Sequence, residues 1–151
     1  MGEKNLKTFL KIRLTFKYIA LLFLTIIAYR ILFVHLLETQ WPWLFVIAMF
    51  FLPIFCYLLQ RKLILETEGK LGHWRLFFYS LIMIWVTAIG VASVLTLASI
   101  LKQVWFFSND VNSISPELSF IGTLYTHFIS YTVFGIPSAI IVRLILLFKK
   151  N

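Results

Sequence analysis

Residues 76–101 read "LFFYSLIMIWVTAIGVASVLTLASIL" and contain no Asp, Glu, Lys or Arg. A helix needs about 20 predominantly apolar residues to cross the hydrocarbon core of a bilayer, and this run exceeds that length. Two more runs without these charged residues lie on either side of it, at residues 41–60 and 118–142. The three runs predict transmembrane helices, and therefore an all-α integral membrane protein.

The composition supports the same class. Hydrophobic residues make up 61% of the 151-residue chain and charged residues 13%, whereas soluble domains average about 45–50% and 25%. A soluble domain of this size could not bury so much apolar surface, and the remainder would form large exposed patches. We therefore expect a single membrane domain over residues 1–151 and no separate soluble domain.

A fourth candidate span, residues 18–37, contains Arg30. Its thirteen Leu, Ile, Phe and Val residues favour insertion by about 4 to 8 kcal/mol in total on the insertion scale. An arginine at the centre of a span costs about 2.5 to 3.5 kcal/mol on the same scale, and less when it lies off-centre. The apolar residues outweigh the arginine, so the sequence predicts a bundle of four membrane-spanning helices.

The basic residues predict how this bundle is oriented. Cytoplasmic loops of membrane proteins carry an excess of Lys and Arg, and four spans place twelve of the fourteen basic residues of this chain on one side. These twelve are Lys4, Lys7, Lys11, Arg13, Lys17, Arg61, Lys62, Lys70, Arg75, Arg143, Lys149 and Lys150. We expect a cell-membrane protein with both termini in the cytoplasm and the anionic headgroups of that leaflet as its lipid partners. The first span should remain as an uncleaved signal anchor, since its apolar region is longer than that of a signal peptide.

Short segments flank the predicted spans. The mixed basic and apolar residues 6–18 predict an interfacial helix before the first span. Gly69 and Gly72 are expected to break the chain between the second and third spans. Pro116 is expected to open the fourth helix, because proline is favoured at the first helical position.

Arg30 and the fourth span hold the polar residues of interest within the membrane. At 100° per residue, Thr123, His127 and Ser130 fall on one face of the fourth span together with other hydroxyl residues. Such a stripe must face protein or water, either as helix–helix contacts or as a proton or solute path centred on His127. Arg30 either extends towards the outer headgroups or pairs near the surface with Glu38 or Glu117, contacts an anion or lipid phosphate, or pairs with a helix of a partner.

Two further patterns concern helix packing. On the third span, Ala88, Ala92, Thr96 and Ser99 form a small-residue face, which lets another helix approach closely, within the chain or between copies. Three other residues predict kinks in the second and fourth spans and would be compatible with gating, although proline also occurs in membrane helices without that role. They are Pro53, Gly135 and Pro137.

Enzyme and cofactor sites are not predicted. His35, His73 and His127 belong to the outer side, the inner side and the membrane interior, so they cannot share a metal ion. Neither paired carboxylates nor a nucleophile elbow, phosphate-binding loop or CxxC motif is present. Cys56 cannot form an intramolecular disulfide, since it is the single cysteine, and we expect it to be a small core residue. The net charge of +8 suits lipid headgroups rather than nucleic acid, because no folded soluble face is predicted to present it.

The segment Tyr131–Pro137, "YTVFGIP", resembles a Tyr-x-x-x-Gly-x-Pro turn found late in small uncharacterised four-span membrane proteins of Gram-positive bacteria. The resemblance covers seven residues and implies a bacterial membrane protein without indicating an activity. Small multidrug transporters also have four spans, but they carry a glutamate in the first span for which this chain has no counterpart.

Three functional hypotheses follow. The first is a non-enzymatic membrane component that assembles with itself or with a larger membrane protein, since the loops are short and the spans lack acidic residues. The alternative is a small transporter or channel-like protein that uses the polar face of the fourth span. A third possibility is the handling of lipid or lipid-linked molecules through Arg30.

Overall fold

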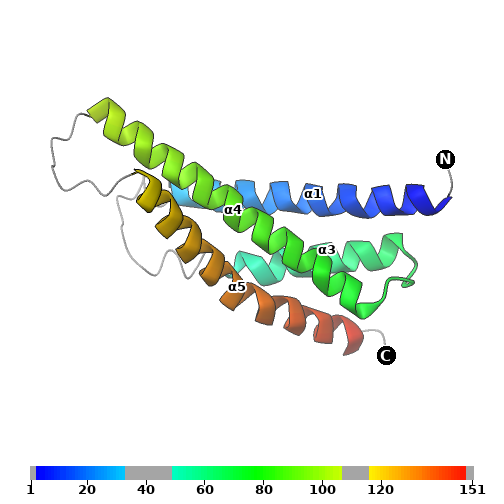
Figure 1. Cartoon of the computed structure of the whole chain (residues 1–151). Coiled ribbons are helices and arrows are strands. Elements are labelled where there is room, and N and C mark those ends of the chain that lie inside the picture. Colours follow the sequence, from blue (N-terminus) through cyan, green and yellow to red (C-terminus); the bar gives the residue numbers. More distant parts are fainter. Residues whose placement is uncertain (1–2, 33–48, 107–115, 149–151) are drawn as a thin grey trace.

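A computed structural model describes the backbone of residues 3–32, 49–106 and 116–148 and the side chains of residues 8–32, 49–98, 121–122 and 124–148 (Figure 1). The described residues form four helices, so the all-α prediction is confirmed. The helices are α1 (Glu3–Arg30), α3 (Phe51–Glu66), α4 (His73–Phe106) and α5 (Pro116–Phe148).

Three of these helices contain segments long and apolar enough to cross a membrane. The segments are Thr8–Arg30 in α1, His73–Ala98 in α4 and Leu124–Phe148 in α5. Helix α3 has 16 residues, so it is about 24 Å long and shorter than the hydrocarbon core of about 30 Å. Residues 41–48 of the predicted second span and 33–37 of the first lie outside the described residues.

The helices extend beyond the predicted spans. Helix α1 begins at Glu3 rather than near residue 18. The predicted helix over residues 6–18 is therefore the first part of α1, and its position at the membrane interface stays a prediction. Helix α3 continues past residue 60 to Glu66, where Lys62 forms an ion pair with Glu66 at 3.0 Å across one turn. A window without charges locates only the part of a helix that hydrocarbon would cover, whereas backbone hydrogen bonding continues beyond it.

A tight turn connects α3 with α4. Glu68 and Gly69 both have left-handed backbone angles, with φ of 51° and 72°, and the amide of Gly69 donates to the carbonyl of Ile64 at 2.9 Å. Glycine adopts this conformation without a steric penalty, which confirms the predicted break at Gly69. The short turn makes α3 and α4 neighbours in space.

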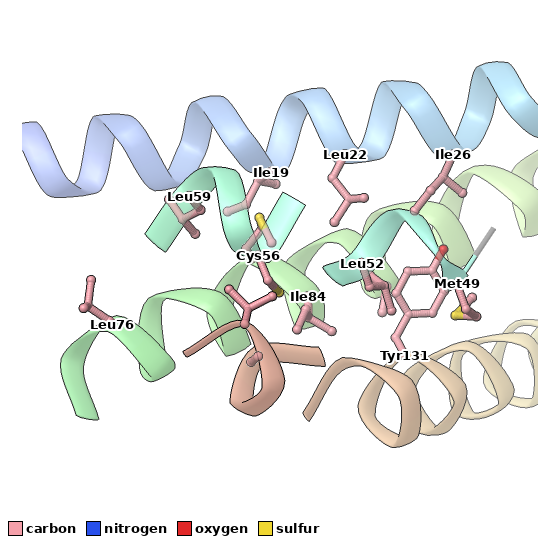
Figure 2. Packing of buried hydrophobic residues seen from close by; sticks show 14 of the residues in the cluster. Ile19, Leu22, Ile26, Met49, Leu52, Cys56, Leu59, Leu76, Ile84 and Tyr131 are labelled. Carbon is pink, nitrogen blue, oxygen red and sulfur yellow. The ribbon is translucent and has the colours of Figure 1, made fainter. Parts of the chain in front are cut away.

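Helix α4 contacts all three other helices and packs most extensively against α5. Figure 2 shows the core between the four helices, where Ile19, Leu22 and Ile26 of α1 point towards α3 and towards Tyr131 of α5. Cys56 is fully buried in this core, as expected for a small apolar residue. The outer faces of all four helices expose large apolar side chains, and such faces are compatible with lipid as their surroundings.

The bundle has two different ends. The beginning of α1, the end of α5 and the α3–α4 turn lie together at one end, and the end of α4 and the beginning of α5 lie at the other (Figure 1). The first of these is called the basic end below. The segments at this end carry the basic residues Lys4, Lys7, Lys11, Arg61, Lys62, Lys70, Arg75 and Arg143. Arg13 and Lys17 lie further along α1.

Candidate functional site

Arg30 and His127 were predicted separately, and the structure brings them into contact. Arg30 is the last residue of α1 and is half-buried, while His127 on α5 is 8% exposed. The Arg30 Nη2 and His127 Nε2 atoms are 3.3 Å apart. Because a guanidinium can only donate, this contact is a hydrogen bond when His127 is neutral and accepts at Nε2. The two candidate residues therefore join α1 to α5 near the end opposite the basic end.

Tyr131 extends this contact into the core. It lies one turn after His127 on α5, and the two rings are stacked with centroids 6.3 Å apart. Tyr131 is 1% exposed and lies beside Met49 and Leu52 (Figure 2). We call Arg30, His127 and Tyr131 the arginine cluster. The sequence signal for Tyr131 was its spacing of four residues from His127, which places both on one helix face.

The other hydroxyl residues of α5 bond mostly to their own helix. Thr126 donates to the carbonyl of Gly122 at 2.8 Å, and Ser138 donates to that of Phe134 at 2.6 Å. Ser130 is half-buried, and the side chain of Thr123 lies outside the described residues. Hydroxyls that bond one turn back are already satisfied by the helix backbone, so these two do not add free groups to a polar stripe.

Trp85 of α4 makes a direct polar contact with Thr132 of α5. Its indole N–H donates to Thr132 Oγ1 at 3.2 Å, and Thr132 in turn donates to the carbonyl of Phe128 at 2.6 Å. The rings of Trp85 and Phe128 also lie 5.9 Å apart. This hydrogen bond joins two helices in the manner expected of polar residues in membrane bundles.

Gln60 is a functional candidate that the sequence analysis missed. It is fully buried, and its Nε2 donates to Ser80 Oγ at 3.0 Å and to the carbonyl of Ala139 at 3.2 Å. One amide thus connects α3, α4 and α5. Among the described residues, no group donates a hydrogen bond to Gln60 Oε1.

The small-residue face of α4 lies inside the chain. Ala88 and Ala92 are fully buried and Thr96 is 5% exposed, while the side chain of Ser99 lies outside the described residues. A Cβ atom on the neighbouring Gly90 would lie 3.2 Å from the ring of Phe23 on α1. The burial of Ala88, Ala92 and Thr96 places the small-residue face inside the chain, whereas Gly90 lies on another side of α4 and packs against α1.

The three predicted kink residues have different places. Pro53 lies in the first turn of α3, where the backbone N–H that proline lacks has no partner within the helix. Residues 41–48 before it lie outside the described residues, so the kink at Pro53 stays a prediction. Pro137 lies inside α5. Gly135 meets α4 so closely that a Cβ atom there would lie 2.8 Å from two atoms of Ile84, so its small size serves packing.

A cavity opens at the basic end, between α3, the α3–α4 turn, the start of α4 and the end of α5. Its volume is about 580 Å³, and its basic lining residues are Arg61, Lys70, His73 and Arg143. Leucine, isoleucine and tyrosine side chains line much of the remainder, and no Asp or Glu is among the lining residues. The sequence analysis counted these basic residues only as flanks of the spans. Their convergence on one cavity depends on the α3–α4 turn.

Arg143 is held in place at this cavity by His73. The Arg143 Nε donates to His73 Nδ1 at 2.9 Å, and Nη2 of the same guanidinium also contacts that nitrogen. This pair joins the end of α5 to the first residue of α4.

The described residues contain no group of three His, Cys, Asp or Glu side chains that could hold a metal ion. Comparisons of the chain with protein-family models, with curated proteins and with solved structures give no match. The residues themselves are therefore the basis for any functional assignment.

Proposed function

We propose that this chain is a four-span protein of the cell membrane with both termini in the cytoplasm. The three apolar helices supply three of the crossings, and residues 41–60 would supply the fourth. The beginning of α1 and the end of α5 lie at the same end of the bundle (Figure 1), which an even number of crossings requires. The basic residues at that end favour the cytoplasmic side.

We propose further that the protein is a non-enzymatic component that acts by binding other membrane molecules at its surface. The observation that supports this is that buried polar side chains tie the helices to one another. Gln60 joins three helices, Trp85 bonds to Thr132, and Arg30 contacts His127. A core used in this way holds the bundle together, which leaves the lipid-facing helix surfaces and the basic end for interaction.

Photocrosslinking in native membranes tests this function. A photoreactive residue is placed at one exposed apolar position on each described helix, Leu24, Ile54, Ile89 and Val133. The buried residue Val91 serves as the control, because a probe there reaches only the chain itself. We expect a discrete protein adduct from at least one exposed position and none from the control. Lipid adducts and monomer alone at all four exposed positions would contradict the proposal.

One observation favours a second candidate function, a small transporter or channel-like protein. His127 lies between Arg30 and Tyr131, and ionisable groups within a membrane commonly belong to ion or proton paths. Purified protein in liposomes should then support proton or solute flux that falls in a His127→Ala variant. Equal flux in wild-type, variant and empty liposomes would exclude this candidate.

A further inference from the structure

The cavity at the basic end lies at a defined depth. Arg61 and Arg143 both line it, and each is the first residue after a predicted span, 41–60 and 118–142. Their guanidinium groups are therefore expected at the level of the lipid headgroups. This placement rests on the four-span arrangement proposed above.

The charge around the cavity is suited to a phosphate group. A guanidinium binds phosphate through two parallel hydrogen bonds, and Arg143 is already oriented by His73. Among the described residues Arg61 makes no ion pair, whereas Lys70 is paired with Glu68 at 2.6 Å. The two arginines thus carry the charge available to a ligand.

The start of α4 adds to this positive field. His73 and Leu76 line the cavity, so the first turn of α4 lies beside it, and that turn contains no acidic residue. The N-terminal end of a helix carries a partial positive charge that favours anions. No lining residue offsets it with a carboxylate.

The rest of the lining of this cavity is apolar. Ile64 and Leu65 of α3 and Leu146 and Leu147 of α5 line the cavity. Its volume of about 580 Å³ is within the range of about 300–1,000 Å³ typical of small-molecule sites. A ligand that fits this site has an anionic head and a hydrocarbon chain, and basic pockets between membrane helices on the cytoplasmic side recognise lipids of this kind.

From these observations we propose that the cavity binds one anionic phospholipid. Its phosphate lies between Arg61 and Arg143, and part of an acyl chain lies along the apolar residues of α3 and α5. This names a partner for the proposed membrane-binding function. It also differs from general attraction of lipids to a basic surface, because it assigns the binding to two arginines out of the many basic residues at this end.

Native mass spectrometry of the full chain in detergent tests the site, with phosphatidylglycerol and phosphatidylcholine of the same acyl chains as probes. We expect the wild-type protein to retain phosphatidylglycerol preferentially. Arg61→Gln and Arg143→Gln should each weaken that binding by about tenfold, the effect of losing one hydrogen-bonded charge. Arg75→Gln is the matched control, since it removes an arginine from the first turn of α4 that does not line this cavity. Protection of the buried Cys56 thiol from labelling shows whether each variant is folded.

Three results would overturn the proposal. The first is equal retention of both lipids by the wild-type protein. The second is a loss of phosphatidylglycerol affinity in Arg75→Gln as large as in Arg61→Gln and Arg143→Gln. The third is displacement of phosphatidylglycerol by inorganic phosphate alone, which would indicate a site for a free anion. Failure of the proposed topology is a separate result, because labelling the two termini on opposite faces would be observed whether or not the lipid binds.

Discussion

Replacement of Gly135 by alanine tests the contact between α4 and α5. A Cβ atom at this position would lie 2.8 Å from both Cδ1 and Cγ2 of Ile84 and 3.3 Å from its Cγ1. Carbon atoms rest about 3.5–4.0 Å apart, so Ile84 or the helix must move by about 1 Å. Overpacking of this kind typically costs about 1–3 kcal/mol of stability.

Gly122→Ala is the matched control, because a Cβ atom there meets no atom of the described residues within 4 Å. Both substitutions gain about 0.5–1 kcal/mol from replacing a glycine inside a helix. The difference in the free energy of unfolding between the two variants therefore isolates the steric cost. Gly122→Ala should be the more stable variant by about 1–3 kcal/mol.

The assay uses Cys56, which is fully buried and the single cysteine of the chain. A thiol reagent in detergent reacts with it when the bundle opens. Labelling of Gly135→Ala should exceed that of Gly122→Ala by about five- to 150-fold, the equivalent of 1–3 kcal/mol. Adding Ile84→Val removes Cδ1 and one of the two shortest contacts, and should restore part of the protection. Equal labelling of Gly135→Ala and Gly122→Ala would refute the close approach of α4 and α5.

Three other predictions follow from the fold. Gln60→Leu should change the free energy of unfolding by less than about 1 kcal/mol, because it removes an unpaired acceptor together with the amide. Gln60→Glu should be clearly less stable, since a carboxylate would face a backbone carbonyl. Greater protection of the Cys56 thiol in the Glu variant than in the Leu variant would contradict this order. Trp85→Phe and Thr132→Val should each lower the stability of the bundle by about 0.6 kcal/mol beyond any packing change. A double-mutant cycle measured with the same labelling assay should show a coupling energy of that size. Additive effects of the two substitutions would mean that the hydrogen bond contributes nothing. Cysteines introduced at Asn5 and Lys149, in a chain whose native cysteine is replaced by serine, should react with an impermeant reagent from the same side of the membrane, and reaction from opposite sides would contradict four spans.

The helical character of the chain was predictable because long runs without charges have few alternatives in lipid. The helix ends were not. Charge marks where hydrocarbon would end, but α1 continues through Lys11, Arg13 and Lys17 towards Glu3, because a helix that has already formed adds further residues at little cost even in water. The actual ends depend on turn chemistry, as at Gly69, where a left-handed residue stops further helix.

The candidate site was predictable only in part. Arg30 and His127 each stand out as polar residues in apolar surroundings, but their contact depends on how α1 is rotated against α5. That rotation is set by buried residues such as Leu22 and Ile26, which have no distinguishing pattern in the sequence. Gln60 was overlooked because it is the last residue of a predicted span, where a polar residue is expected. The structure shows it turned into the core instead.

In the proposed membrane setting, the length of α4 and α5 determines how these helices fit the bilayer. They contain 34 and 33 residues, so each is about 50 Å long, against a hydrocarbon thickness of about 30 Å. Helices of this length match a bilayer by leaning or by protruding into water, each at a modest energetic cost. A thicker, more ordered bilayer lets the α4–α5 pair stand more upright, and a thin one forces it to lean further. Bilayer thickness is therefore a variable that changes the tilt of this bundle without any change in the contacts between its helices.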